Sequence, residues 1–469
     1  MKVYYIPIVG VQWHLLFWVN RKNEWGWTRD MTAEMDKNGQ TVAICNSLIS
    51  WRPMYFLVGS SEIAEYFKRE ADIAIKKSLQ TKPVVPLGFF YKHTAKDLHM
   101  RGVFAQVFEA KNLSKISPRV QEICRVNLEK LKANIFKNGS SERVDVDLVP
   151  TIDQIFRDLL DMILFGESED RIDGQTLTAA MARIVQEGIS YEFDLENLGT
   201  FGLLRDLNLS PKIRCMRRRY ELIKASINKR YKNVCAQEIK ENSFLGNVAA
   251  YNIENPGSQI STEDIVGSCA LLVFASYDTT RHSSNWAVNF LKENQTIQES
   301  VYQEIKNLDL ERNQEEIEKL ESNEMLDKFV KETLRLGSPF MASDIKQFVK
   351  KCKIGKFVFQ KGDMIFVGLG MSSAKESKFK NALSFDPERF DKENKRTWDR
   401  MDYIPFSSGR RQCIGQYMAL MNLKIVVKEI LKAFKLEDDP SFDREVGDFL
   451  VHVRRNALVK LSPRIVNEE

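Results

Sequence analysis

The chain has 469 residues, of which 43% are hydrophobic, and it contains only 23 glycines and 13 prolines. These values favour a large packed core and exclude a chain made mostly of flexible linkers. The formal net charge of +5 is not accompanied by an aromatic-interleaved basic stripe, so we expect no nucleic-acid partner. The seven cysteines include no C-x-x-C pair and the five histidines no H-x-x-x-H pair, which argues against a disulfide framework and against structural zinc.

Apolar patterns divide the chain into a small β part and a larger helical part. Short strands are predicted at residues 40–45 and 54–58, and a helix follows at 60–68. Helical periodicity is then sustained over three long stretches, at residues 117–136, 152–165 and 212–232. The predicted fold class is therefore mainly α with a smaller β portion.

Residues 242–261 are polar and contain Pro256-Gly257, so a loop is predicted there. Residues 355–367 and 449–461 alternate between apolar and polar residues in the manner of hairpins. The sequence shows no internal repeat and no low-complexity tract, and we expect one large domain.

A long apolar helix is predicted to open at Ser261, because Asp264 follows its hydroxyl at the spacing of a capping box. Further along this helix, Asp278 and Thr279 interrupt the apolar run. Polar groups in such a run need a partner or a function. Either Thr279 bonds back to a carbonyl one turn earlier and bends the helix, or the two residues have a chemical role.

Two charged residues, Glu332 and Arg335, lie three apart on a helix predicted over residues 323–336. Residues at this spacing share one face of a helix and can pair. An ordinary exposed ion pair would have the same spacing. Residues 385–390 follow with the sequence Phe-Asp-Pro-Glu-Arg-Phe, which includes Arg389.

Near the C-terminal end, Cys413 lies in a loop just before a helix predicted over residues 416–434. Gly409 and Gly415 let the backbone of this loop turn tightly and pass close under a flat ligand, where a Cβ would collide. The positive end of the helix dipole favours a thiolate at Cys413. The alternative is a buried cysteine that serves only as a small apolar residue.

This loop resembles the cysteine-ligand loop of the cytochrome P450 family, whose pattern F-x-x-G-x-R-x-C-x-G is met at Phe406, Gly409, Arg411, Cys413 and Gly415. The resemblance implies that Cys413 is the proximal ligand of a haem b iron and that Arg411 binds a haem propionate. It also implies the cytochrome P450 fold, with a long central helix over the haem, in one domain that spans residues 1–469.

Residues 275–279 are similar to the family segment [AG]-G-x-[DE]-T, although Ser276 stands where glycine is usual and the bulky Tyr277 follows it. The resemblance implies that Asp278 and Thr279 help deliver protons during the activation of O2. The P-E-R-F sequence at residues 387–390 also matches the family.

That second match implies that Arg389 joins Glu332 and Arg335 in a buried network beneath the cysteine loop. The family's W-x-x-x-R element falls at residues 97–101, where its tryptophan is missing. Arg101 remains a candidate propionate partner, with a surface helix residue as the alternative. Lys346 is the candidate for a further basic position at which the family often has arginine.

The resemblance implies a haem-thiolate monooxygenase that inserts one oxygen atom from O2 into an apolar organic substrate such as a lipid, a sterol or a xenobiotic. The resemblance also implies that an NADPH-linked reductase supplies the electrons. Two alternatives remain: a peroxygenase, isomerase or dehydratase on the same haem, and a haem sensor or carrier without turnover. The retained Asp278 and Thr279 argue against both.

No stretch of the sequence is long and apolar enough to cross a bilayer as a helix. Residues 1–20 resemble the segment that follows the membrane anchor in microsomal members of the family, and contact with a membrane surface is expected there. The resemblance implies the cytosolic face of the endoplasmic reticulum, with a peripheral or cytoplasmic location as the alternative.

Overall fold

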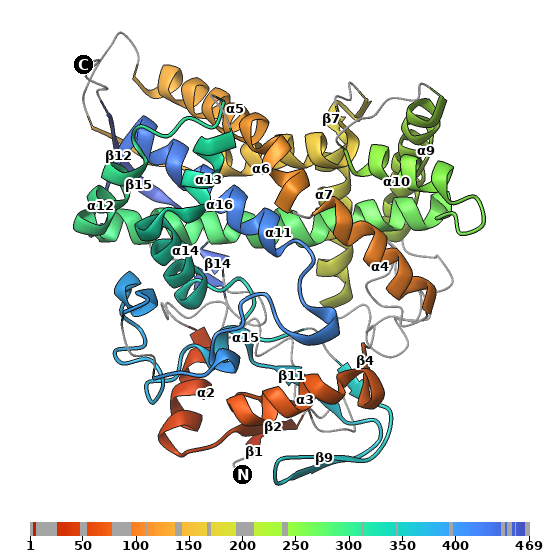
Figure 1. Ribbon diagram of the computed structural model, residues 1–469, viewed down its shortest axis with the longest axis vertical. Helices are drawn as coiled ribbons and strands as arrows, with labels where there is room; N and C mark the ends of the chain where they lie inside the picture. The colour runs from red at the N-terminus through yellow and green to blue at the C-terminus, as the bar shows by residue number, and fades with distance from the viewer. Residues whose placement is uncertain are drawn as a thin grey trace. The chain divides into compact units, whose positions relative to one another are not determined.

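The computed structural model describes residues 3–5, 26–46, 54–76, 95–108, 110–136, 143–166, 170–193, 211–236, 243–311, 314–343, 346–393, 397–441, 446–447, 453–454 and 456–464. Helices predominate and a smaller set of strands accompanies them (Figure 1). This mainly helical class with a smaller β portion confirms the predicted fold class.

The chain divides into two compact units. Unit 1 comprises Met1–Ile75, Ser117–Ile155 and Thr279–Glu469, and unit 2 comprises Lys76–Ile116 and Phe156–Asp278. Three helices run through the boundaries, namely α5 (Ala110–Ile135), α6 (Val149–Phe165) and α11 (Thr262–Glu293). The organisation as one domain stays a prediction.

A six-stranded mixed sheet carries the β part of unit 1. Its strands follow the order β1-β2-β3-β11-β8-β4 and are β1 (Val3–Tyr5), β2 (Val42–Asn46), β3 (Met54–Leu57), β4 (Ala74–Lys76), β8 (Lys346–Phe348) and β11 (Met364–Val367). The central pair β3 and β11 is parallel, with Phe56 opposite Phe366, and the two rings stack at 4.8 Å. The helices α2 (Gly26–Lys37) and α3 (Ser60–Ile73) contribute side chains to the two apolar clusters around this sheet.

The prediction of a hairpin over residues 355–367 was wrong, because the hairpin lies over residues 352–359 and the strand after it pairs elsewhere. The strands β9 (Cys352–Ile354) and β10 (Phe357–Phe359) pair with each other around Gly355, whose φ is 54°. The strand β11 pairs instead with β3 and β8. Its run Met-Ile-Phe-Val is almost wholly buried, which suits a central strand better than a hairpin arm.

The C-terminal alternation over residues 449–461 likewise belongs to two different sheets. The strand β15 (Leu458–Pro463) lies between β12 (Phe434–Glu437) and β5 (Val144–Asp147). The strand β14 (Val453–Arg454) pairs with β13 (Val446–Gly447). Residues 448–452 lie outside the described residues.

The remaining helices of unit 1 include α14 (Glu324–Leu336), which carries Glu332 and Arg335, and α16 (Gln416–Ala433), which follows the cysteine loop. The others are α12 (Gln295–Ile305), α13 (Gln314–Ser322), α15 (Leu369–Ser372), η4 (Pro387–Phe390), η5 (Arg400–Asp402) and η6 (Gly409–Arg411). The bounds of α14 and α16 agree with the predictions to within one residue.

In the residues that the structure describes, unit 2 consists of helices and one short two-stranded ribbon. Its further elements are α4 (Ala95–Val107), β6 (Arg171–Ile172), β7 (Gln175–Thr176), α7 (Leu177–Phe193), α9 (Pro211–Ala236) and α10 (Phe244–Glu254).

The helix α10 corrects the prediction of a loop over residues 242–261. Ser243 caps the helix, because its hydroxyl accepts a hydrogen bond from the Gly246 amide at 3.1 Å. Phe244, Leu245 and Val248 are fully buried. Residues 244–253 are mostly apolar, so the sequence itself carried the signal for this helix, and the loop is reduced to the residues between α10 and α11.

Of the predicted membrane-surface segment over residues 1–20, only 3–5 are described, as β1, which pairs in parallel with β2. In the part of the chain that the structure describes, no helix has both the length and the apolarity to span a membrane.

Candidate functional site

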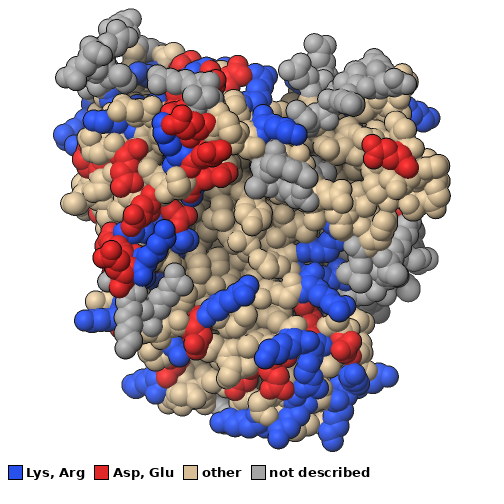
Figure 2. All heavy atoms as spheres, viewed as in Figure 1, with Lys and Arg blue, Asp and Glu red and all other residues tan. Residues whose placement is uncertain are grey.

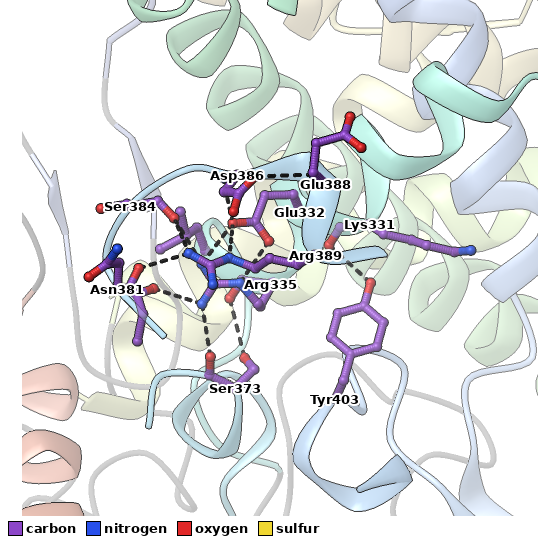
Figure 3. Close-up of polar contacts among 12 residues, drawn as sticks. Lys331, Glu332, Arg335, Ser373, Asn381, Ser384, Asp386, Glu388, Arg389 and Tyr403 are labelled. Atoms are coloured by element: carbon purple, nitrogen blue, oxygen red, sulfur yellow. Dashed lines mark hydrogen bonds and ion pairs between the residues drawn. The ribbon is translucent and has the colours of Figure 1, made fainter. Parts of the chain in front are cut away.

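The helix α14 begins at an asparagine cap and presents a buried ion pair near its C-terminal end. Asn323 accepts a hydrogen bond from the Leu326 amide at 2.9 Å. Arg335 donates from Nε and Nη2 to the two carboxylate oxygens of Glu332, at 2.7 and 2.8 Å (Figure 3). Both side chains are 0% exposed. The pair is therefore not the exposed ion pair that its spacing also allowed.

The remaining hydrogen-bonding groups of this pair are satisfied by the segment that follows the sheet. Arg335 Nη1 donates to the carbonyls of Ser373 and Ala382, at 3.0 and 2.7 Å. Glu332 accepts from Arg389 Nε at 3.2 Å, so the three predicted network residues meet. A buried charge is tolerated only when its partners are complete, and this network meets that condition.

Lys328 is a further member of this region that the sequence analysis missed. Its ammonium group pairs with Asp391 at 2.7 Å and with Glu388 at 3.2 Å, which ties α14 to η4. The hydrogen bond to Asp391 raises the pKa of Lys328. Lys328 lies four residues before Glu332, so the face already marked by the Glu332–Arg335 pair could have pointed to it.

Tyr403 joins the segment before the cysteine loop to the same helix. Its hydroxyl donates to the Lys331 carbonyl at 3.0 Å (Figure 3). Burial, with a smaller contribution from the Glu332 carboxylate, raises the pKa of this phenol. The hydroxyl therefore stays protonated and keeps its donor role.

The cysteine loop runs from Tyr403 through η6 to the start of α16. The Cys413 amide donates to the Phe406 carbonyl at 3.0 Å, which folds the loop back on itself. Gly415 then caps α16, so Cys413 lies just before the helix N-terminus. Arg411 is half-buried at the end of η6, and Phe406 is half-buried beside it in the loop. All five residues of the loop pattern thus lie within one turn-rich segment.

The two glycines of this loop have different roles. Gly409 has a φ of 73°, and a Cβ there would lie 3.1 Å from the Phe67 ring. The fold itself therefore requires glycine at this position. At Gly415 the nearest protein atoms to a Cβ are Cys413 Sγ at 3.9 Å and Met418 Cε at 4.0 Å, which are ordinary contacts. The protein leaves open backbone beside the sulfur atom at this position.

Among the cysteines whose side chains are described, Cys413 and Cys215 on α9 are exposed and Cys235 is half-buried. Cys124, Cys269 and Cys352 are buried, whereas Cys413 is exposed. Burial raises the pKa of the Cys124 and Cys269 thiols, so both remain protonated. The alternative of a buried apolar cysteine at position 413 is wrong. An exposed sulfur at a helix N-terminus, beside open backbone, fits a flat group that carries a thiolate-ligated metal.

The helix α11 carries the predicted acid–alcohol pair at the point where the chain passes from unit 2 to unit 1. Its capped start is as predicted, since the Asp264 amide donates to Ser261 Oγ at 3.2 Å. Asp278 is the last residue of a unit 2 segment and Thr279 the first of a unit 1 segment. Both side chains are half-buried, and Ala275, one turn before Thr279, is exposed. The helix thus exposes one alanine close to the predicted pair.

The turn after Thr279 contains two serines that bond back to the helix. Ser283 Oγ donates to the Thr279 carbonyl at 2.9 Å, and Ser284 Oγ donates to the Thr280 carbonyl at 3.0 Å. Such back-bonding can bend a helix. The chemical role and the bending role of Thr279 both stay predictions.

A polar chain in the next turn of α11 was also missed. Arg281 Nη1 lies 3.1 Å from an oxygen of Asp153, and Nη2 lies 2.9 Å from His282 Nε2. Burial, with a smaller contribution from Arg281, lowers the pKa of His282 to about 3. The imidazole is therefore neutral at physiological pH, and Nε2 accepts from the guanidinium.

Two further basic candidates lie in different places. Arg101 is half-buried on α4 of unit 2, and its propionate role stays a prediction. Lys346 is 3% exposed on β8, and its ammonium group pairs with Glu70 of α3. The Lys346 charge is thus paired with a carboxylate of the same unit.

The described residues include no cluster of three His, Cys, Asp or Glu side chains able to hold a metal.

Comparison with known proteins gives a consistent result. The family model described as Cytochrome P450 matches residues 12–458. Among curated proteins, the chain is 26% identical to secologanin synthase 1 of Catharanthus roseus, over 73% of this chain and 66% of that protein. It is 24% identical to cytochrome P450 72A15 of Arabidopsis thaliana, over 83% of this chain and 75% of that protein. The match to the first of these relatives thus spans about two thirds of its length.

A solved structure of cyanobacterial CYP120A1 with bound retinoic acid shares the fold. It matches with a TM-score of 0.76 over 98% of both chains, at 20% sequence identity.

Proposed function

Since the chain belongs to the cytochrome P450 family, we propose that it is a haem-thiolate monooxygenase, which inserts one oxygen atom from O2 into an apolar organic substrate. The observation that carries the proposal is the exposed Cys413 sulfur, held before α16 beside the open backbone at Gly415. A bound haem b would supply the iron centre that activates O2 when electrons arrive.

The residues of the cysteine loop would hold the group. Cys413 would provide the thiolate ligand, which the N-terminal end of α16 stabilises. Arg411, and Arg101 from unit 2, would donate charge-assisted hydrogen bonds to propionates. The buried network of Glu332, Arg335 and Arg389 would fix the backbone that precedes the loop, through the carbonyls it binds.

Asp278 and Thr279 of α11 would deliver protons during the activation of O2. The Thr279 hydroxyl would donate a hydrogen bond toward O2, and the Asp278 carboxylate would pass protons from solvent to that hydroxyl. The half-buried Phe274 and the exposed Ala275, just before this pair, are apolar, which supports a lipid, sterol or xenobiotic as substrate.

An NADPH-linked reductase is proposed as the electron donor, at the cytosolic surface of the endoplasmic reticulum. The basic sequence, with a net charge of +5, would attract an acidic donor protein. A peroxygenase or isomerase would need neither this donor nor the acid–alcohol pair, and a haem carrier would show no turnover.

The proposal is tested by the spectrum of the ferrous carbon monoxide complex. We expect the red-shifted Soret band of thiolate ligation in the wild type and its loss in Cys413→Ser. Cys215→Ser is the matched control, since Cys215 is also exposed but lies on α9. A wild-type band like that of a histidine-ligated globin would contradict the assignment. NADPH consumption with added reductase then separates a monooxygenase from a haem carrier.

A further inference from the structure

Lys346 and Glu70 form an ion pair inside unit 1. Lys346 is 3% exposed on β8 and Glu70 is 6% exposed on α3, and the Lys346 ammonium group pairs with Glu70 Oε1. Figure 2 shows many other lysines, arginines and carboxylates at the surface, where water and salt screen their charges. A buried charge acts more strongly on its surroundings, because the effective dielectric constant is lower than that of water.

Side chains of α3 surround the Lys346 ammonium group. Its Nζ lies 5.8 Å from the centre of the Tyr66 ring and 6.0 Å from the centre of the Phe67 ring. An aromatic ring attracts a cation at this distance through the negative charge of its face. The protein itself therefore stabilises the charge of Lys346, through one carboxylate and two rings of the same helix.

The second carboxylate oxygen of Glu70 lies toward the cysteine loop. A Cβ at Gly409 would have Glu70 Oε2 3.5 Å away, and the other two of its three nearest atoms belong to Phe67. Lys346 is not among these atoms, so the carboxylate is the charge of the pair that lies nearer to Gly409. Within the described residues, no group donates a hydrogen bond to Oε2, although this atom is buried. The negative end of the ion pair thus faces the loop that carries Cys413.

Regular secondary structure fixes the positions of both charges. Lys346 lies opposite Ile365 in the antiparallel pairing of β8 with β11. The helix α3 packs on this sheet through Ile63, Tyr66 and Ile73, which belong to one apolar cluster with Ile365. The ion pair is therefore held between a strand and a helix, and its charges keep a constant direction toward the loop.

We propose that the Lys346–Glu70 pair tunes the reduction potential of the iron that Cys413 would ligate. The Glu70 carboxylate, as the nearer charge, would oppose the addition of an electron and lower the potential. Lys346 would offset part of this effect. The potential would thus lie between the values that either charge alone would produce. The inference deepens the proposed function and rests on its haem-thiolate assignment.

The other role open to a lysine at this position is a hydrogen bond to a haem propionate. To make that contact, Lys346 would have to leave Glu70, and the carboxylate would then be buried without its partner. The observed ion pair therefore favours an electrostatic role for Lys346 over a propionate contact.

The test compares midpoint potentials from redox titrations of the holoprotein. Glu70→Gln removes the negative charge at nearly constant volume and should raise the potential by about 59 mV, which is a tenfold change in the equilibrium constant of a one-electron couple. Lys346→Met removes the positive charge and should lower the potential. The double variant should lie between the two single variants. An unchanged potential in Glu70→Gln, or shifts of the same sign in both single variants, would overturn the proposal.

The matched control is Asp438→Asn, which also removes the carboxylate from a buried lysine of unit 1. The Lys292 side chain is 1% exposed and its Nζ lies 3.0 Å from Asp438 Oδ1. Lys292 follows Thr279 by thirteen residues on α11, about 20 Å along the helix axis. This control should keep the wild-type potential. A shift equal to that of Glu70→Gln would mean that the position of the charge does not matter and would overturn the proposal.

Lys346→Met leaves a buried carboxylate alone, so this variant can fail to fold. In that case the fall in potential from Glu70→Gln to the double variant measures the effect of the lysine, and the absence of any fall would contradict the proposal.

The rate of haem transfer from the holoprotein to excess apomyoglobin separates the two roles of Lys346. We expect the double variant to retain haem like the wild type, because no propionate contact is lost. Faster loss from the double variant than from Glu70→Gln would identify Lys346 as a propionate partner and overturn the proposal. The carbon monoxide spectrum of each sample is recorded first. A wild type without the thiolate band contradicts the proposed function, whereas a normal band with unchanged potentials contradicts only this inference.

Discussion

The guanidinium of Arg335 holds both carboxylate oxygens of Glu332, at 2.7 and 2.8 Å, in a part of the protein where neither side chain is exposed to solvent. Arg389 completes the set, because its Nε donates to the Glu332 oxygen that also accepts from Arg335 Nη2. The structure thus uses an i,i+3 pair, which is usually a weak surface feature, as the centre of a buried junction between α14 and the segment that leads to η4.

Breaking this junction should impair folding rather than one chemical step. We expect Glu332→Ala or Arg335→Ala to lower the free energy of unfolding by about 3–5 kcal/mol, since the remaining charge would be buried without its partner. The measurement is haem content per chain together with a denaturant melt. Arg119→Ala is the matched control, because Arg119 and Glu122 have the same i,i+3 spacing at 49% and 40% exposure. Equal melts for all three variants would contradict the prediction.

The two glycines of the cysteine loop should separate folding from haem uptake. Gly409→Ala places a side chain at a φ of 73° beside Phe67, and should destabilise the apoprotein by roughly 1–2 kcal/mol. Gly415→Ala meets no close protein atom and should cost the apoprotein about 1 kcal/mol at most. We expect haem titration to show the larger loss in Gly415→Ala. Wild-type haem uptake by that variant would show that the open backbone serves no ligand.

Removal of the Thr279 hydroxyl should uncouple oxygen consumption from product formation. We expect Thr279→Ala to bind haem and substrate but to release a larger share of reducing equivalents as peroxide, since proton delivery is disturbed while the ligand loop is intact. Thr279→Ser keeps the hydroxyl and should restore coupling. Product and peroxide are measured per NADPH consumed, and unchanged coupling in Thr279→Ala would favour the bending role.

The buried His282 should make the fold sensitive to mild acid. Its pKa of about 3 in the folded chain lies below the unfolded value near 6.5, so the unfolded chain binds the additional proton as the pH falls. Stability should therefore decrease below about pH 6.5, with a slope that approaches about 1.4 kcal/mol per pH unit for this group.

His282→Gln should have a shallower pH dependence, because its amide oxygen can still accept from Arg281 but does not titrate. Denaturant unfolding at a series of pH values between neutral and mildly acidic conditions gives the slope. His99→Gln is the control, since His99 is exposed and bonds to the Tyr251 hydroxyl. Identical slopes in the wild type and His282→Gln would rule out this role.

The sequence alone determined the local parts of the site. The start of the helix near Asn323, the spacing of Glu332 and Arg335, the glycine-flanked Cys413 and the helix after it are all set within a few residues of chain. Capping, helical periodicity and tight turns depend on near neighbours, so these features were predicted at nearly the correct bounds. The family resemblance rested on the same local patterns.

Tertiary structure alone decided partners and burial. It revealed that Lys328 bonds to Asp391, sixty-three positions away, and that Lys346 pairs with Glu70. It also moved β11 from a hairpin into the centre of the sheet. The physical reason is that the contribution of a charge, a strand edge or an apolar face to stability depends on the residues that pack against it. Those residues come from distant parts of the chain.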